Sequence, residues 1–282
     1  MTLGYRVRDF LMSPLQVDFA VVDDLLQEAA HARLAGRGAI AVARSGRIGP
    51  IIELAMGSLQ HAGEYDSVSV EGGFATSLRA ALESGRPFGG AYRDIAGAFP
   101  LGAQNPVVVR QSGWDQWTAH ADNAARVQGL NSHLVAGLMG ALVEMQDNVY
   151  EHSGAPTTGL VAYAVTSTSF EFVVADRGAG VLATLRQNSR YAYISDAGAA
   201  LGEAIKDGVS RFPDEKGRGT GFNQLFTALV GHNAELRFRS GDHALTMRPT
   251  RDALRGQIVL AKVPPLDGLA VSVICRIQSG GR

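Results

Sequence analysis

Three groups of residues between positions 144 and 222 have types and spacings that could do chemistry together. The first is Glu144, Asn148 and His152, spaced four apart in a segment with helical periodicity. Residues four apart lie on one face of a helix, so these side chains, with Glu151 beside them, can meet a single ligand. Magnesium prefers oxygen ligands such as the carboxamide of Asn148, and Glu144 could accept a proton from an attacking hydroxyl or water. A solvated acidic helix face is the alternative interpretation.

The second group is Asp176, Gly178 and Gly180, which follow a run rich in β-branched residues. An ionised carboxylate only accepts hydrogen bonds, so Asp176 could bind the exocyclic amine of adenine and would repel the guanine carbonyl. Such a bond contributes roughly 1.5–3 kcal/mol, which is enough for a preference. The two glycines would let the backbone approach a purine ring closely. A plain Asp-Gly turn at the end of a strand is the alternative.

The third group is a glycine-rich run with a basic residue before it: Lys216, Gly217, Arg218, Gly219, Thr220, Gly221 and Phe222. It lacks the lysine and hydroxyl positions of a Walker loop and does not fit the dinucleotide pattern. Its backbone N–H groups, and the N-terminus of a helix predicted for residues 222–231, could bind phosphates. The polar residues 210–216 suit a lid that brings Lys216 and Arg218 within reach of the β- or γ-phosphate. A surface loop without function is the alternative.

An α/β framework is predicted to position these groups. Residues 131–153 should form a helix, because leucines and other apolar residues recur on one stripe with polar residues opposite. Residues 159–165 and 169–175 are β-rich and predict a hairpin. Further helices are expected at 182–187, 197–210 and 222–231, and further strands at 234–238, 243–247, 257–263 and 269–277. This order predicts a two-layer α/β sandwich, with a mixed sheet that carries helices on one face.

The first part of the chain predicts a smaller α/β domain with a parallel sheet. Its expected elements are a helix near 21–30, a strand at 39–43, a helix beginning near Pro50, a strand at 67–71 and a helix at 74–84. Residues 85–105 are rich in glycine and proline and indicate an irregular connection, so the predicted domains are 1–105 and 106–282. Residues 106–110 could be an edge strand. Trp114 and Trp117 are expected to open a helix and to act as packing anchors between the domains.

Composition limits the classes of function. The chain of 282 residues has 46% hydrophobic and 19% charged residues, as in ordinary globular proteins. A net charge of −1 gives no general attraction to nucleic acid, and the scattered arginines after residue 235 suggest a solvated face. The long uncharged stretches lack the apolar density of a membrane span. The single Cys275 lies in an apolar run and no secretory leader is evident, so the cytoplasm is the expected location.

Taken in order, the three groups resemble the N, G1 and G2 boxes of the GHKL ATP-binding fold, known from histidine kinases, Hsp90-type chaperones, MutL and type II topoisomerases. The Glu-x-x-x-Asn-x-x-x-His form is most similar to the bacterial anti-sigma-factor serine kinases, and the match covers roughly residues 130–278. The resemblance implies a Bergerat-type fold that binds ATP and Mg²⁺. It also implies Asn148 as the magnesium ligand, Glu144 as the base and Asp176 as the adenine reader. The glycines would form hinges and a phosphate cradle, and His152 would support the site.

Two departures qualify the resemblance. None of the seven histidines precedes Asp or Glu, which disfavours an autophosphorylating histidine kinase. The anti-sigma kinases are typically single domains, whereas here a leading α/β unit comes first, and that unit resembles a STAS-type regulatory domain. The expected function is an ATP- and Mg²⁺-binding regulatory protein that phosphorylates a protein partner, as a serine/threonine kinase, or otherwise controls it. The expected partner is STAS-type or sigma-factor-like. An ATP-hydrolysing clamp, which would imply a homodimer, and a nucleotide-gated adaptor without catalysis are the alternatives.

Overall fold

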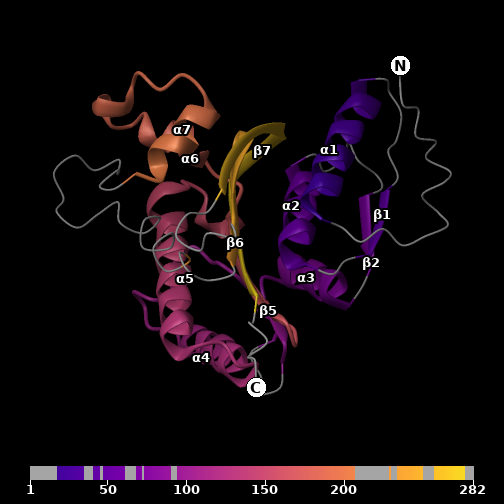
Figure 1. Ribbon diagram of the computed structural model, residues 1–282, viewed down its shortest axis with the longest axis vertical. Coiled ribbons are helices and arrows are strands. Elements are labelled where there is room, and N and C mark those ends of the chain that lie inside the picture. Colours follow the sequence, from indigo (N-terminus) through magenta and orange to yellow (C-terminus); the bar gives the residue numbers. More distant parts are fainter. Residues whose placement is uncertain are drawn as a thin grey trace.

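The computed structural model describes residues 18–34, 41–44, 47–60, 68–71, 73–89, 94–206, 229, 234–249 and 257–276. In this part of the chain a five-stranded sheet lies between two layers of helices, and a small two-stranded sheet lies beyond one of these layers (Figure 1). The α/β class predicted from the sequence is therefore confirmed.

The large sheet is antiparallel throughout, with the strand order β3-β4-β5-β7-β6. Its strands are β3 (Ala96–Pro100), β4 (Leu160–Val165), β5 (Ser169–Asp176), β6 (Ala234–Arg248) and β7 (Gln257–Arg276). The predicted β4–β5 hairpin is confirmed, and the four last predicted strand segments are two long strands. The pairing of β6 with β7 shifts register around Gly241, whose φ of 59° glycine adopts readily.

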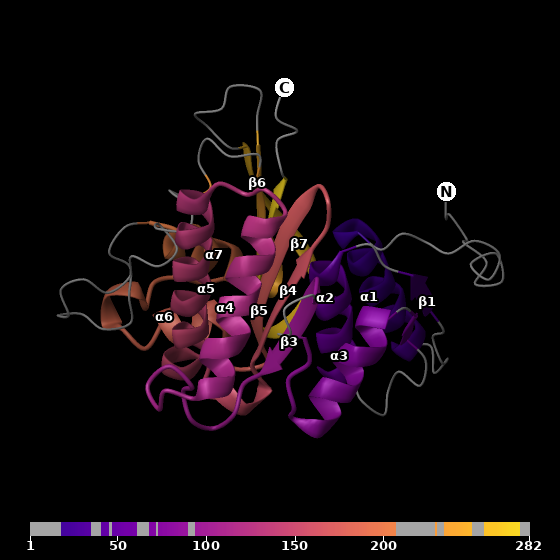
Figure 2. The ribbon, with the colours of Figure 1, turned by 90° about the horizontal axis from the view of Figure 1, so that it is seen from below.

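One face of the sheet is covered by α4 (Ser112–Val127), α5 (Ser132–His152), α6 (Gly180–Leu185) and α7 (Ala197–Ala204) (Figure 2). The short 3-10 turn η2 (Pro156–Thr158) lies between α5 and β4, and η3 (Ser189–Tyr191) lies between α6 and α7. The side chain of Asn131 caps α5 by accepting from the backbone N–H of His133, 2.9 Å away. Strand alternation directs Phe172 and Val174 of β5 into the same core as the buried leucines of α5.

The opposite face is covered by α1 (Phe19–Leu34), α2 (Ile48–Gln60) and α3 (Gly73–Ser84) from the first part of the chain. The described helices of the later part lie on one face, as predicted, but the covering of the other face by the first part was not predicted. Ile52 and Met56 of α2 pack in a second core with Val173 and Ala175 of β5. Both faces of this sheet are therefore apolar, and one helical layer could bury only one of them. The prediction of a mixed sheet is wrong, because all the described strand pairs of the large sheet are antiparallel.

The predicted small parallel sheet is confirmed. Strands β1 (Ala41–Arg44) and β2 (Val68–Glu71) pair in parallel and are joined through α2. The STAS-type resemblance and the boundary at residue 105 remain predictions, although β3, which precedes that boundary, pairs with β4 and so belongs to the large sheet.

Buried ion pairs attach the first helical layer to the sheet. Arg239 of β6 is fully buried, and its Nη1 lies 2.8 Å from both Asp23 Oδ1 of α1 and Glu53 Oε2 of α2. Arg237, on the same face of β6, contacts the same two carboxylates. These arginines were expected on a solvated face, and that prediction is wrong. Breaking a buried pair by removing one partner typically costs about 3–5 kcal/mol, so the four charges fix where the layer docks.

A second charged contact holds the start of α2. The buried carboxylate of Glu171, on β5, accepts hydrogen bonds from the backbone N–H groups of Ile48 at 3.0 Å and Gly49 at 3.2 Å. Burial raises the pKa of Glu171, and the neighbouring Arg47 opposes that rise. Glu171 thus satisfies free N–H groups at a helix N-terminus from a distant strand, as a capping side chain does.

Two local predictions fail near the helix α4. Residues 106–110 form a turn in which Arg110 has a φ of 49°, whereas the edge strand is β3, inside the segment expected to be irregular. Trp114 and Trp117 do lie on a helix and are buried, where they stack at 5.8 Å between ring centroids and pack on Phe99. Their packing role is therefore confirmed, and a position between two domains stays a prediction.

Cys275 lies in the core on β7 and is 1% exposed, as expected of a thiol that packs as a small apolar group. Burial raises its pKa to about 12. No helix in the described ranges combines the length and apolar character that a membrane crossing requires.

Candidate functional site

The end of α5 is joined by hydrogen bonds to the loop that follows β5. The carbonyl oxygen of Ser153 accepts from the backbone N–H of Ala179 at 2.7 Å. The carbonyl oxygen of His152 accepts from the hydroxyl of Thr184 at 3.2 Å. The first two predicted groups, on α5 and after β5, are therefore neighbours on the same face of the sheet.

Asp176 is the last residue of β5 and is only 2% exposed. It follows Phe172 and Val174 at alternating positions, so its side chain points to the α5 side of the sheet. Its Oδ1 accepts from the backbone N–H of Gly178 at 2.7 Å. Burial raises the pKa of this carboxyl to about 6, and that hydrogen bond opposes the rise. At pH 7 the carboxylate is mostly ionised and can still accept hydrogen bonds.

The glycines of this loop make close contacts between backbones. A Cβ on Gly178 would overlap the carbonyl oxygen of Ser153, and a Cβ on Gly268 would overlap the carbonyl oxygen of Asp176. Gly180 has a φ of 71° and packs on Ser240. Gly178 and Gly180 therefore bring the loop against α5 and β6, and their approach to a purine ring remains a prediction.

The three α5 residues differ in exposure. Glu144 is exposed, whereas Asn148 and His152 are half-buried. Partial burial raises the pKa of Glu144, and the charges of Asp147 and Glu151 raise it further. The Nδ2 of Asn148 lies 3.9 Å from the sulfur of the buried Met145. The described residues leave the carboxamide oxygen of Asn148 available for a ligand.

The third predicted group, from Lys216 to Phe222, lies outside the described residues. Its predicted roles in phosphate binding and as a lid therefore stay predictions.

Two residues that hold the loop after β5, Ser240 and Gly268, were not identified from the sequence. The hydroxyl of Ser240 accepts from the backbone N–H of Val181 at 3.0 Å and donates to the carbonyl oxygen of Gly268 at 2.7 Å. Each residue lies beside an irregular point, since Ser240 precedes the shift in strand pairing and Gly268 has a φ of 77°. Isolated glycines inside strand patterns are the signal that indicates such points.

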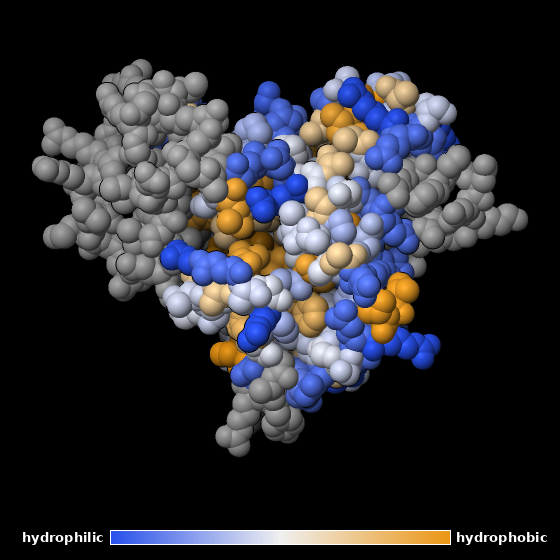
Figure 3. Space-filling view, turned by 180° about the vertical axis from the view of Figure 1, so that it is seen from behind, coloured by the Kyte–Doolittle hydropathy of each residue, from blue (hydrophilic) through white to orange (hydrophobic). Residues whose placement is uncertain are grey.

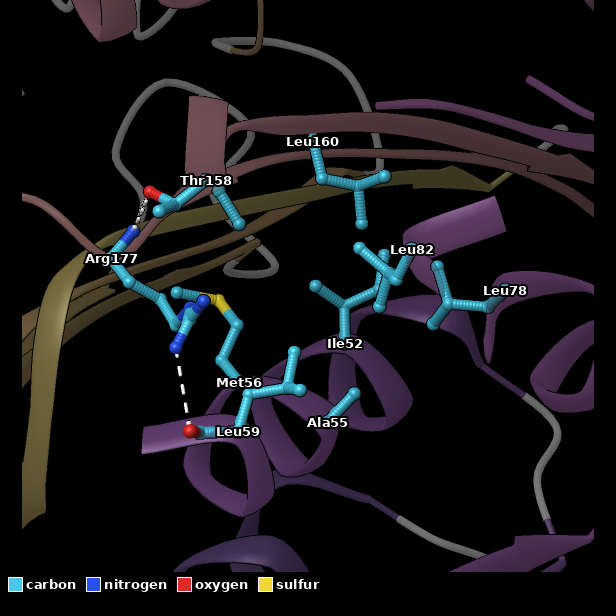
Figure 4. Close-up of a pocket in the computed structure, with 10 residues that line it drawn as sticks. Ile52, Ala55, Met56, Leu59, Leu78, Leu82, Thr158, Leu160 and Arg177 are labelled. Carbon is cyan, nitrogen blue, oxygen red and sulfur yellow. Dashed lines mark hydrogen bonds between the residues drawn. The ribbon is translucent and has the colours of Figure 1, made fainter. Parts of the chain in front are cut away.

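A small cavity lies on the other face of the sheet, between α2, α3 and the strands β4 and β5 (Figure 4). Its volume is about 20 Å³, which is room for about one water molecule. Arg177 and Thr158 lie at one end, and the remaining lining is apolar. This cavity is too small for a nucleotide and is separate from Asp176.

Seen from behind, the surface has mixed polar and apolar side chains, with apolar ones in a hollow near its middle (Figure 3).

Among the described residues, no group of three or more His, Cys, Asp or Glu side chains is placed to hold a metal ion. A magnesium ion at Asn148 would therefore take most of its oxygen ligands from water and phosphate, as this ion commonly does. Comparison of the chain with protein-family models, curated proteins and solved structures found no match.

Proposed function

We propose that this protein is an ATP- and magnesium-binding regulatory protein of the GHKL type that phosphorylates a serine or threonine of a protein partner. The observation that supports this most is the contact between Ser153 and Ala179. It brings the helix with Glu144 and Asn148 beside the loop that follows Asp176, so the first two groups lie next to each other. The proposal includes a Bergerat-type fold for the later elements, a STAS-like fold for the first ones and a cytoplasmic location.

Asp176 would select the adenine base. Its carboxylate is buried beside an apolar core and is bound, among the described residues, only by the N–H of Gly178. One oxygen then remains for the exocyclic amine of adenine, and a guanine carbonyl at that position would be repelled. The raised pKa also supports the assignment, because strongly perturbed carboxyls concentrate at functional sites.

Asn148 and Glu144 would act at the phosphates. Asn148 precedes Ser153 by five residues, about 7.5 Å along the helix axis, so the phosphates can lie over α5 while adenine reaches Asp176. The half-buried carboxamide fits a magnesium ion that keeps several waters. When bound, this ion neutralises charge on the phosphates. The exposed Glu144, whose pKa is raised, is suited to take a proton from the attacking group.

Binding is tested by calorimetry with ATP and GTP on the wild-type chain and on Asp176→Asn. A hydrogen bond to a charged group contributes about 1.5–3 kcal/mol, so the variant should bind ATP about 10- to 150-fold more weakly. Asp122→Asn, which alters only a surface pair with Arg126, is the matched control. Equal ATP affinity in wild type and Asp176→Asn would remove Asp176 from the nucleotide site.

The reaction is tested with γ-labelled ATP and a protein partner obtained by co-purification. Label on a serine or threonine of the partner supports the kinase. Release of free phosphate supports the clamp, and retained ATP with neither product supports the adaptor. A STAS-type or sigma-factor-like partner is expected among the proteins captured.

A further inference from the structure

The Asp176 loop, residues 176–181, is held by hydrogen bonds of Ser240 on β6. The Ser240 hydroxyl accepts from Val181 N–H and donates to the carbonyl oxygen of Gly268. Gly268 in turn packs directly against the backbone carbonyl of Asp176. Ser240 is 3% exposed, so its two hydrogen bonds have no competition from bulk water. The position of the loop is therefore linked to one hydroxyl.

The residue before Ser240 connects the same place to the first helical layer. Arg239 and Ser240 are consecutive on β6, so their side chains point to opposite faces of the sheet. Arg239 contacts Asp23 of α1 and Glu53 of α2, and its Nη2 donates to the carbonyl oxygen of Pro264 at 2.6 Å. Pro264 and Gly268 belong to the same stretch of β7. The carboxylates of α1 and α2 act through Arg239 on the carbonyl of Pro264, and the Ser240 hydroxyl bonds to the carbonyl of Gly268. The segment 264–268 of β7 is thus held from both faces of the sheet.

We propose that Ser240 is a positioning residue for the Asp176 loop, and that the first helical layer sets the position of this loop through Arg239. The inference rests on the proposed function, because it takes Asp176 as the adenine reader. It adds a role for α1 and α2, since any event that loosens their docking should also loosen the loop. The link consists of the ion pairs of Arg239, its hydrogen bond to Pro264, the backbone from Pro264 to Gly268, and the hydrogen bond from Ser240 to Gly268. These contacts form a physical path between the two faces.

The loop can be tested without nucleotide by hydrogen exchange of the Val181 amide in the full chain. Loss of a hydrogen bond of ordinary strength corresponds to a change of about fivefold, so Ser240→Ala should speed this exchange by about that factor. Ser272→Ala is the matched control. Ser272 is a buried serine of β7 whose hydroxyl has no hydrogen-bond partner in the described structure, and its removal should leave Val181 unchanged.

The link to the first helical layer is tested with Asp23→Asn. This change keeps an oxygen acceptor for Arg239 but removes the negative charge of the Asp23 carboxylate. Hydrogen exchange at the Val181 amide should therefore increase by about twofold or more. Asp24→Asn, at the exposed neighbouring position of α1, is its control and should have no effect. Unchanged exchange in Asp23→Asn would overturn the link, and unchanged exchange in Ser240→Ala would overturn the positioning role itself.

Nucleotide binding gives the second measurement. If Ser240 acts through Asp176, Ser240→Ala should reduce the ratio of ATP to GTP affinity by about fivefold, whereas general damage would weaken both nucleotides equally. Equal weakening would therefore contradict the inference. If the wild-type chain binds no ATP while Ser240→Ala still speeds exchange at Val181, the proposed function fails and the support of the loop by Ser240 stands.

Discussion

Asp176→Asn should make the folded protein more stable at neutral pH, although the same change is expected to weaken ATP binding. Burial raises the pKa of this carboxyl from 3.8 to about 6. Since one pKa unit corresponds to about 1.4 kcal/mol, the ionised carboxylate costs the folded state about 3 kcal/mol. Asparagine has nearly the same shape, carries no charge and can still accept from the N–H of Gly178.

The sign of the pH dependence follows from proton binding. The folded protein holds the Asp176 proton more tightly than the unfolded chain does, so between about pH 4 and pH 6 the folded state binds more protons. The Asp176 contribution to stability therefore falls as pH rises through this window, and the full cost is present above it. The advantage of Asp176→Asn should be about 3 kcal/mol at pH 7.5 and near zero below pH 4.

Urea unfolding without nucleotide measures this difference. Wild type, Asp176→Asn and the surface control Asp122→Asn are compared at pH 7.5 and pH 4, and the dependence on urea should be the same for all three. The surface control should change stability by less than about 1 kcal/mol at either pH. If Asp176→Asn were equal to or less stable than wild type at pH 7.5, the carboxylate would be stabilised where it lies, and the argument from burial would be refuted.

Three further changes test other parts of the structure. Glu144→Ala should retain ATP binding but lose turnover by about 100-fold or more, as expected on removal of a general base, and full activity would show that another group positions the nucleophile. Glu53→Gln should lower the free energy of unfolding by about 3–5 kcal/mol, because it removes the negative charge between two buried arginines, and a loss below about 1 kcal/mol in urea unfolding would contradict the ion-pair assignment. Gly178→Ala should destabilise the protein by about 2 kcal/mol or more, since its Cβ would overlap the backbone of Ser153. In the control Gly202→Ala, where a Cβ has open space on a helix, thermal unfolding should show no loss of stability.

The sequence predicted the elements whose pattern is local. The apolar stripe of α5, the β4–β5 hairpin and the strand-helix alternation of the first part follow from residue spacing within about twenty positions, and all are confirmed. The end of β5 and the end of α5 were predicted to share a site, and the hydrogen bond from Ala179 to Ser153 shows that they meet. Whether a nucleotide binds there stays a prediction.

The second helical layer could not be predicted because its determinants are far apart in the chain. Arg239 pairs with Glu53 across 186 positions, and in the sequence each of these residues has the appearance of an ordinary surface charge. Glu171 likewise has its partners more than 120 positions away, at the start of α2. Residues 172–175 of β5 are apolar at every position, as in a strand that is covered on both faces. Only the packing of α2 shows which segment covers the second face.

Because Cys275 is buried, the rate at which its thiol is modified can report on global unfolding of the chain. A thiol with a pKa of about 12, buried on an interior strand of the sheet, holds almost no thiolate at neutral pH and should be inert to alkylating reagents while the core is intact. Its rate of modification would then follow the rare excursions that separate β7 from its neighbours. A second cysteine introduced at an exposed position could be labelled selectively beside it, so fluorescent probes of partner docking need no cysteine-free background.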